Sequence, residues 1–227
     1  MLDEEHNTPT DFNRSPSDQN KYTFGRMGDH NLVVASLPAG VHGTISANTT
    51  ASQMLSSFPN IRIGLMVGIG AGIPKPEEHD IRLGDVVVSQ PEGTCGGVVQ
   101  YDLGKVKADG SFERKGMLNQ PPLALMSALS SLQARHIKFA PKISLYVNNM
   151  LKQYPRMAKP RPRTPSYIYQ GVDNDKLFEP AYLHVGGPSC AACEPAREIA
   201  RDARDSTDRK LCSQSCFSTS SVADWVS

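Results

Sequence analysis

The sequence predicts an α/β domain in which a mixed, largely parallel central sheet is flanked by helices. Apolar runs of strand length alternate along the chain with segments of helical periodicity, and this alternation is typical of α/β sheets. The chain has 227 residues, of which 39% are apolar, which is enough to form one sizeable packed domain.

The expected elements begin after residue 20. Residues 22–27 and 31–37 flank a Gly-Asp-His turn and predict a β-hairpin. A helix should start at Thr44 or Ser46 and end at Phe58, because Pro59 follows. The apolar residues 61–67 predict a buried parallel strand. Further strands are expected at 85–89, 97–102 and 181–185, and further helices at 121–133 and 143–154.

The two ends of the chain differ from its centre. Residues 1–20 contain almost nothing that could be buried, so we expect a disordered lead-in. Residues 21–208 carry the predicted domain. Residues 209–227 are rich in Ser and lack periodicity, which indicates an irregular tail.

Charge and hydropathy argue against nucleic-acid and membrane partners. The 24 Lys and Arg residues nearly balance the 23 Asp and Glu residues, so the chain has no overall attraction to polyanions. The basic, proline-rich residues 156–165 are short, and we interpret them as a solvated loop. No segment approaches the ~20 apolar residues that span a bilayer. The N-terminus does not resemble a signal peptide, and a cytoplasmic location is expected.

The five cysteines are expected to be free thiols in a reducing compartment. Cys190-x-x-Cys193 and Cys212-x-x-x-Cys216 approach a four-cysteine zinc pattern, but the second pair has three intervening residues instead of the usual two. Redox chemistry at Cys190 and Cys193 is a further alternative, and Cys95 should be a loop thiol. The histidines show no metal spacing (His30, His79, His136, His184). We therefore predict neither a metal nor a cofactor.

A glycine-rich loop is the most informative local feature. Gly68-x-Gly70-x-Gly72 follows the apolar run, and glycine lets a backbone approach a ligand closely. A dinucleotide site does not fit, because Ile73 replaces the third glycine and Pro74 follows where a helix should open. No Gly-Lys-Ser/Thr follows, which excludes a P-loop. A glycine turn without a ligand remains an alternative.

Several blocks in order resemble the nucleoside phosphorylase/nucleosidase superfamily. The similarity is greatest to the version found N-terminal in filamentous-fungal NLR-type receptors and ankyrin-repeat proteins. It covers roughly Tyr22 to Asp208, and its order and spacing make it more specific than the glycine loop alone. The shared blocks are 37–40, 64–70, 80–91, 96–105 and 116–122.

The resemblance implies binding of a nucleoside, most readily a purine nucleoside, and cleavage of its N-glycosidic bond. In that family the glycine loop lies under the ribose and base. Phosphorylase relatives carry an Arg and a hydroxyl residue where this chain has Met66 and Ile69, and an apolar pair cannot hold phosphate. Hydrolysis is therefore favoured over phosphorolysis. The implied substrate-binding residues are Gly68, Ile69, Gly70, Ala71, Gly72, Val41 and His42.

The family's catalytic acids have no counterpart at matching positions, so we assign no catalytic residue. The resemblance implies an incomplete domain, truncated at both ends, and a possible homo-oligomer for the intact one. Two functions remain open. One is N-glycosidic bond cleavage, as in the intact family. The alternative is a non-catalytic regulatory or interaction module of an NLR-type or ankyrin-repeat receptor.

Overall fold

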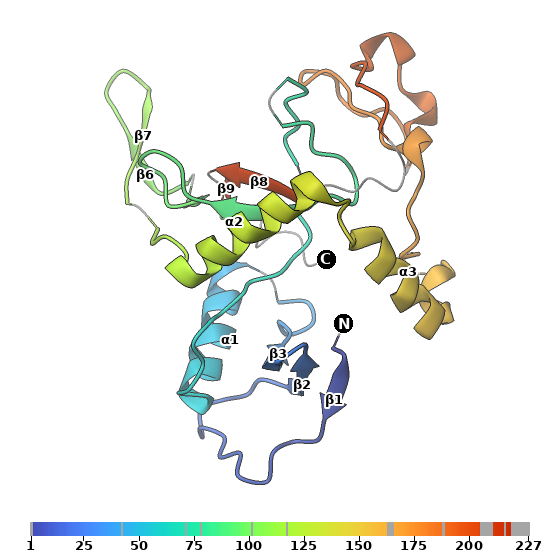
Figure 1. The fold of residues 1–227 in the computed structure, drawn as a ribbon. Coiled ribbons are helices and arrows are strands. Elements are labelled where there is room, and N and C mark those ends of the chain that lie inside the picture. Colours follow the sequence, from blue (N-terminus) through green and yellow to red (C-terminus); the bar gives the residue numbers. More distant parts are fainter. Residues whose placement is uncertain are drawn as a thin grey trace. The chain divides into compact units, whose positions relative to one another are not determined.

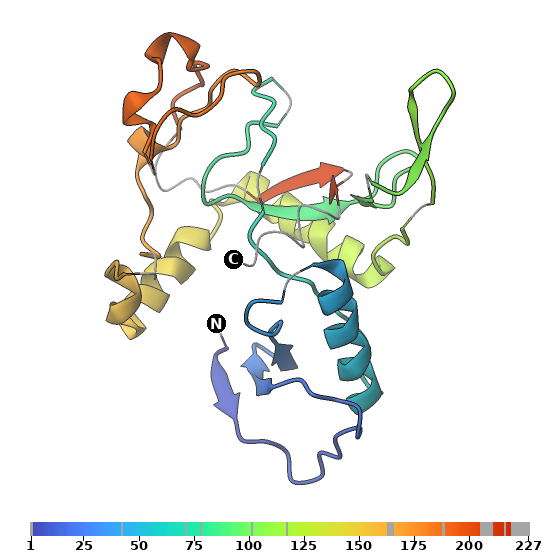
Figure 2. The same ribbon diagram turned by 180° about the vertical axis from the view of Figure 1, so that it is seen from behind.

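A computed structural model of the chain divides into two compact units (Figures 1 and 2). Unit 1 comprises Met1–Ala71, Ser89–Leu123 and Ser215–Ser227, and unit 2 comprises Gly72–Val88 and Ala124–Gln214. The structure describes residues 2–41, 43–70, 72–77, 79–100, 102–116, 118–162, 166–187, 189–204, 211–215 and 217–218.

Unit 1 is built around an antiparallel sheet and one helix. β2 (Tyr22–Met27) and β3 (His30–Ala35) form the predicted hairpin, and Gly28 at its turn adopts a positive φ of 56° that suits glycine. β1 (Glu4–His6) pairs with the other edge of β2. α1 (Thr44–Ser57) confirms the predicted helix and runs beside this sheet (Figures 1 and 2).

An aromatic cluster forms the core between this sheet and the end of α1. The ring of Phe12 stacks on that of Phe58, with ring centroids 4.7 Å apart. Tyr22 meets Phe58 edge-on at 4.9 Å, and Phe24 lies 5.6 Å from Phe12. Each ring buries a large apolar area, so Phe12 holds the preceding segment to the unit.

Residues 2–20 therefore differ from the disordered lead-in that composition predicts. They contribute β1 and Phe12 to unit 1. Average composition misses this, because one aromatic ring and one strand edge supply contacts that a count of polar residues conceals. The domain boundaries at residues 20 and 208 stay a prediction.

A buried polar cluster joins the segment before β2 to α1. The Asp18 carboxylate accepts hydrogen bonds from Tyr22 Oη at 2.7 Å, from Asn20 N–H at 2.9 Å and from Ser57 Oγ. Asn20 Nδ2 also donates to the Thr50 carbonyl oxygen at 2.8 Å. Burial raises the pKa of Asp18, but the hydrogen bonds from Ser57, Tyr22 and Asn20 outweigh burial and leave that pKa below its ordinary value.

The remaining strands of unit 1 are short. β5 (Val98–Val99) lies inside the strand predicted at 97–102 and pairs in parallel with β9 (Phe217–Ser218). β6 (Gly104–Val106) and β7 (Phe112–Arg114) form a second hairpin.

Residues 61–70 have no regular secondary structure, so the strand predicted at 61–67 is not formed. Ile61 is half-buried, but the side chains from Arg62 onward face solvent, and Val67 is 89% exposed. A buried strand requires partner strands at its edges and cover on its faces, and an apolar run does not by itself provide them. The strands of the described residues form four small sheets, ordered β1-β2-β3, β4-β8, β5-β9 and β6-β7. A central parallel sheet therefore stays a prediction.

Helices supply most of the regular structure of unit 2. α2 (Leu123–Lys138) and α3 (Ile143–Gln153) confirm the helices predicted at 121–133 and 143–154. α2 carries Arg135, His136 and Lys138 in its last turn, where positive charge is favourable to the helix dipole. No helix of the described residues is both long and apolar enough to cross a bilayer.

The other elements of unit 2 are irregular or short. β4 (Val86–Gln90) begins in this unit, confirms the strand predicted at 85–89 and pairs with β8 (Leu211–Ser215). The strand predicted at 181–185 is not formed: Ala181 lies in a turn, and residues 182–185 have no regular secondary structure. The 3-10 helices are η1 (Pro155–Ala158), η2 (Val172–Asn174), η3 (Cys190–Ala192) and η4 (Pro195–Arg197).

Candidate functional site

Gly68 and Gly70 of the predicted glycine loop lie in the irregular segment at the end of the first stretch of unit 1, Met1–Ala71. A Cβ atom placed on Gly68 or Gly70 would meet no other atom within 4 Å, and Ile69 is exposed. The backbone here is therefore open to a ligand, as a glycine loop under a nucleoside requires. Open space is not a formed pocket, and the nucleoside site stays a prediction.

The other predicted site residues are placed only in part. Val41 is exposed and follows Gly40, whose φ is 77°. His42 and Ala71 lie outside the described residues. Gly72 belongs to unit 2, where a Cβ atom would lie 2.8 Å from Ile81 Cγ2, so a larger residue at this position would displace Ile81.

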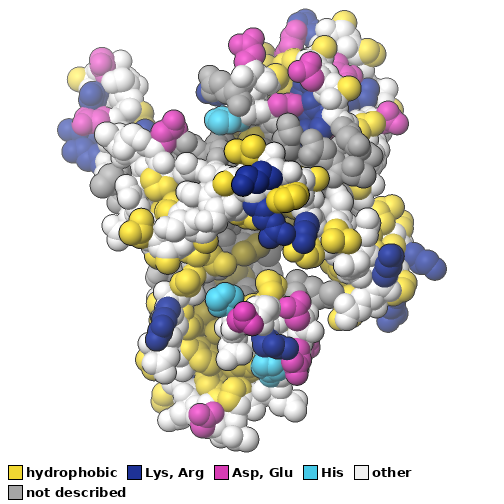
Figure 3. All heavy atoms as spheres, in the orientation of Figure 1, with side chains coloured by type: hydrophobic (Ala, Val, Ile, Leu, Met, Phe, Trp, Pro, Cys, Tyr) yellow, Lys and Arg dark blue, Asp and Glu magenta, His cyan; other side chains and the backbone are white. Residues whose placement is uncertain are grey.

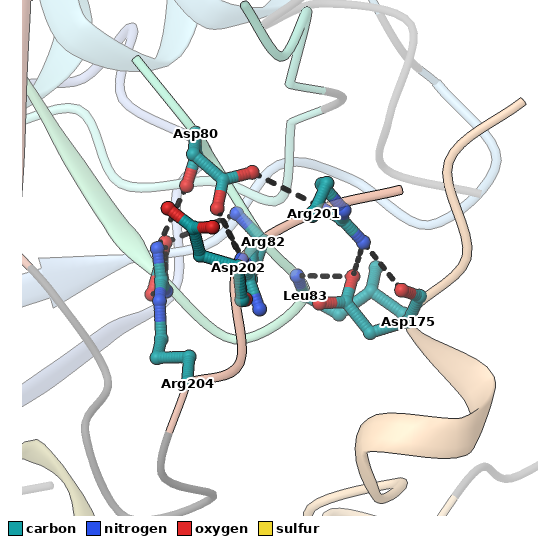
Figure 4. A network of polar contacts seen from close by, with 8 residues as sticks. Asp80, Arg82, Leu83, Asp175, Arg201, Asp202 and Arg204 are labelled. Carbon is teal, nitrogen blue, oxygen red and sulfur yellow. Dashed lines mark hydrogen bonds and ion pairs between the residues drawn. The ribbon is translucent and has the colours of Figure 1, made fainter. Parts of the chain in front are cut away.

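Unit 2 contains a network of alternating acidic and basic side chains that sequence reasoning did not find (Figure 4). Its residues come from three segments: the chain before β4, the end of η2 and the residues near 201–204. Arg201 and Asp80 are 121 positions apart, so no local spacing connects them. The available signal was the repeated acid–base alternation in Asp80-Ile81-Arg82 and Arg201-Asp202-Ala203-Arg204.

Arg201 is the centre of this network. Its side chain is only 7% exposed and lies 3.3 Å from Asp80 Oδ1 and 3.1 Å from Asp175 Oδ1. It also donates to the backbone carbonyl oxygen of Asp175. Asp175 in turn accepts a hydrogen bond from Leu83 N–H at 3.3 Å. Arg201 thereby joins three chain segments within one unit.

Arg204 and Arg82 complete the network. Arg204 Nη1 lies 2.8 Å from both carboxylate oxygens of Asp85, whose side chain is 1% exposed. Arg204 Nη2 donates to the Asp80 carbonyl oxygen at 2.7 Å. Arg82 contacts the Asp80 carboxylate at 2.5 Å and the Asp202 carbonyl oxygen at 2.6 Å. The charges satisfy one another, which indicates a structural clamp rather than a ligand site.

The pH dependence of this clamp follows from Asp80. Burial raises the pKa of Asp80. The hydrogen bond from Arg82 and the positive charges of Arg82 and Arg201 lower this pKa by more than burial raises it, so it lies below its ordinary value. A folded-state pKa below the unfolded one adds stability that is present above the unfolded pKa. That stability is lost as the pH falls through the folded pKa.

We therefore expect the free energy of unfolding of unit 2 to fall on acidification below the ordinary aspartate pKa of about 4. Urea unfolding across this pH range measures the effect. Asp80→Asn removes the titrating group, so the free energy of unfolding of this variant should fall less steeply as the pH is lowered. An unchanged acid slope in Asp80→Asn would contradict the assignment.

Three side chains of unit 2 could hold a metal ion. One ligand atom from each of His184, Cys190 and Cys193 lies within 4.8 Å of the others. The sequence singled out the cysteine pair but not His184. Cys216, which the four-cysteine alternative requires, lies outside the described residues.

The cysteines do not all match the expectation of free thiols. Cys190 and Cys193 are free, but Cys95 is disulfide-bonded in the structure. Sequence spacing cannot reveal such a bond, because the fold decides which cysteines meet.

The chain is 50% identical over 117 residues to a protein of Hyaloscypha variabilis described as a nucleotide-binding leucine-rich repeat (NLR)-like protein. The match covers 52% of this chain and 11% of that relative, so it spans about a tenth of the relative's length. No protein-family profile matches the sequence, and no solved structure matches the chain. The similarity to a fungal NLR-like protein is confirmed. The nucleoside phosphorylase assignment gains no support.

Proposed function

We propose that this chain is a non-catalytic regulatory or interaction module of an NLR-type receptor. The observation that carries the proposal is the 50% identity over 117 residues to an NLR-like protein. Identity at this level over half of the chain supports a common origin for this segment. Because the relative is much longer than the match, a module works there beside other parts of the same protein.

An exposed apolar segment supports an interaction role. Four apolar side chains within five positions are each at least 70% exposed: Leu65, Met66, Val67 and Ile69. Hydrophobic side chains also reach the surface in several patches of the face drawn in Figure 3. Scattered exposed apolar residues are normal, but a contiguous run is typical of a surface that another protein covers. We propose that residues 65–69 contact the rest of the receptor.

The test measures binding between this chain and the remainder of the Hyaloscypha variabilis relative, expressed without its homologous segment. We expect the two to bind. Val67→Asp should weaken binding by at least about tenfold, because it places a charge in the apolar contact.

Ile45→Asp on α1 is the matched control. Ile45 is 83% exposed and Val67 is 89% exposed, and Ile45 lies outside the proposed surface, so this control should leave binding unchanged. Failure of the unsubstituted chain to bind would reject the module proposal. Equal effects of the two variants would reject the proposed surface.

Nucleoside binding is a second candidate. The open backbone at Gly68 and Gly70 favours it, since no other atom would meet a Cβ atom there within 4 Å. A general acid or base contributes typically about 10²–10⁴-fold in rate, and the family resemblance supplies no matching acid in this sequence. We propose a module that retains a nucleoside site without catalysis.

The expected result is that adenosine, guanosine or inosine binds to the chain but releases no free base above background, with or without phosphate. Calorimetry measures binding and chromatography measures the base. Gly70→Val should weaken binding, because its side chain would fill the space above the loop. Base release at an enzymatic rate would show instead that the chain is a nucleosidase or phosphorylase.

A further inference from the structure

Residues 180–196 form a loop that is closed at its base. Glu179 N–H donates to the Arg197 carbonyl oxygen at 3.1 Å, and Ile199 N–H donates to the Leu177 carbonyl oxygen at 2.8 Å. These two bonds form a short antiparallel stem. The stem fixes the ends of the loop and limits how far residues inside it can separate.

The loop has almost no hydrophobic core of its own. Among its described residues only Cys193 is buried, at 7% exposure, while Leu183 and Val185 face solvent. A segment this small cannot offset its chain entropy by apolar burial. Small loops without a core are commonly held by a disulfide or a metal ion.

The backbone of the loop brings three ligand side chains together. Cys193 N–H donates to the Cys190 carbonyl oxygen at 3.1 Å, which closes η3 and places both thiols on one tight turn. Gly186 has a φ of 94° and lies in the turn between His184 and Cys190. Cys193 Sγ contacts the Val185 carbonyl oxygen at 3.9 Å, so the buried thiol lies beside the residue that follows His184.

We propose that His184, Cys190 and Cys193 bind Zn²⁺. Their ligand atoms lie within 4.8 Å of one another. Zn–S bonds of about 2.3 Å in a tetrahedral site place two sulfurs roughly 3.8 Å apart. The ligand atoms must therefore move closer together when the metal binds. Small side-chain rotations are sufficient, because His184 is exposed and Cys190 is only half-buried. The fourth position is left for a water molecule, as in other three-ligand zinc sites.

The donor set selects the metal. Soft thiolates favour zinc over magnesium or calcium, which prefer oxygen ligands. Two thiolates and a neutral imidazole carry two negative charges, which one Zn²⁺ ion neutralises. Each thiol gives its proton to solvent on binding, so one zinc ion releases two protons if both thiols start protonated. The site does not depend on the function proposed above.

The experiment uses the full 227-residue chain, reduced and free of metal, titrated with Zn²⁺ and with Co²⁺ as a spectroscopic probe. We expect one metal ion per chain and the charge-transfer and ligand-field bands of a tetrahedral cobalt site with thiolate ligands. Bound zinc should also protect Cys190 and Cys193 from alkylation. A chain that binds no metal stoichiometrically, or thiols that zinc does not protect, would overturn the proposal.

Variants identify the ligands. Loss of a second-shell group typically costs about 10–100-fold in metal affinity, so Cys190→Ser, Cys193→Ser and His184→Gln should each weaken zinc binding by more than about 100-fold. His30→Gln is the matched control for His184→Gln, because His30 is also exposed but lies on β3, outside the cluster, and it should retain the affinity. Loss of binding in that control, or full affinity in His184→Gln, would overturn the assignment of these three ligands.

Discussion

Replacing Arg201 with methionine is expected to lower the free energy of unfolding of unit 2 by about 3–5 kcal/mol. The substitution retains much of the side chain's apolar length but removes the guanidinium that lies between Asp80 and Asp175. It leaves two carboxylates in a largely buried network without their shared partner. A buried charge that loses its partner costs much more than the pair contributed when intact.

Arg197→Met provides the matched control. Arg197 also forms an ion pair, with Glu179 at 2.8 Å, but its side chain is 53% exposed. Exposed pairs contribute only about 0–1 kcal/mol, so this variant should unfold almost as the unsubstituted chain does.

Urea unfolding measures the free energy of unfolding of both variants. Hydrogen exchange at Leu83 N–H and Ile199 N–H then measures the local stability around these two amides. These amides donate to Asp175 Oδ1 and to the Leu177 carbonyl oxygen, so they report on the network and on the stem beside it. Equal effects of Arg201→Met and Arg197→Met would contradict the view that burial makes this network essential.

Replacing Asp18 with alanine is expected to destabilise unit 1 by about 2–3 kcal/mol, because buried donors lose their acceptor. Tyr22 Oη, Asn20 N–H and Ser57 Oγ all donate to this carboxylate. Ser57 is the last residue of α1 and Tyr22 begins β2. The variant should therefore loosen the contact between the helix and the sheet, and hydrogen exchange in α1 and β2 measures this.

Asp109→Ala is the matched control for this prediction. Asp109 also accepts two hydrogen bonds, from Ser111 N–H and Ser111 Oγ, but it is exposed and the bonds are local to one turn. Its loss should leave the unfolding midpoint unchanged. If Asp18→Ala behaved like this control, the polar cluster would not hold the N-terminal segment in unit 1.

Acid should reproduce part of the Asp18 effect. The pKa of Asp18 is below its ordinary value in the folded chain, so its stabilisation is present above the unfolded pKa. It is lost as the pH falls through the folded pKa. The free energy of unfolding of unit 1 should therefore depend less on pH in the Asp18→Ala variant than in the unsubstituted chain.

The contacts within residues 175–201 are arranged one inside another along the sequence. Arg201 contacts Asp175 at the outer end, and the stem hydrogen bonds between 177–179 and 197–199 follow. The His184–Cys190–Cys193 cluster lies inside them. The charge clamp holds the outer end without any ligand, whereas the loop at the inner end lacks a buried core. The proposed zinc ion would thus act at the point where protein contacts are fewest.

Local sequence signals are enough to predict the short-range elements of this protein. The β2–β3 hairpin and the three helices depend on signals within a few residues: the turn at Gly28, the proline after Phe58 and the apolar spacing of α2. These preferences act along the chain and need no distant partner. The sequence also marked the Cys190–Cys193 pair and the similarity to fungal NLR-type receptors, which the Hyaloscypha variabilis relative supports.

Contacts between residues that are distant in the sequence depend on the fold of the whole chain. Residues 61–67 have the composition of a buried strand but form none, because a strand exists only where partners pair with its edges. Phe12 became part of a core because Phe58 lies against its ring. Arg201 reaches Asp80 across 121 positions, and a turn at Gly186 brings His184 to two cysteines. Such contacts depend on chain reversal and burial, and neither is encoded in the spacing of neighbouring residues.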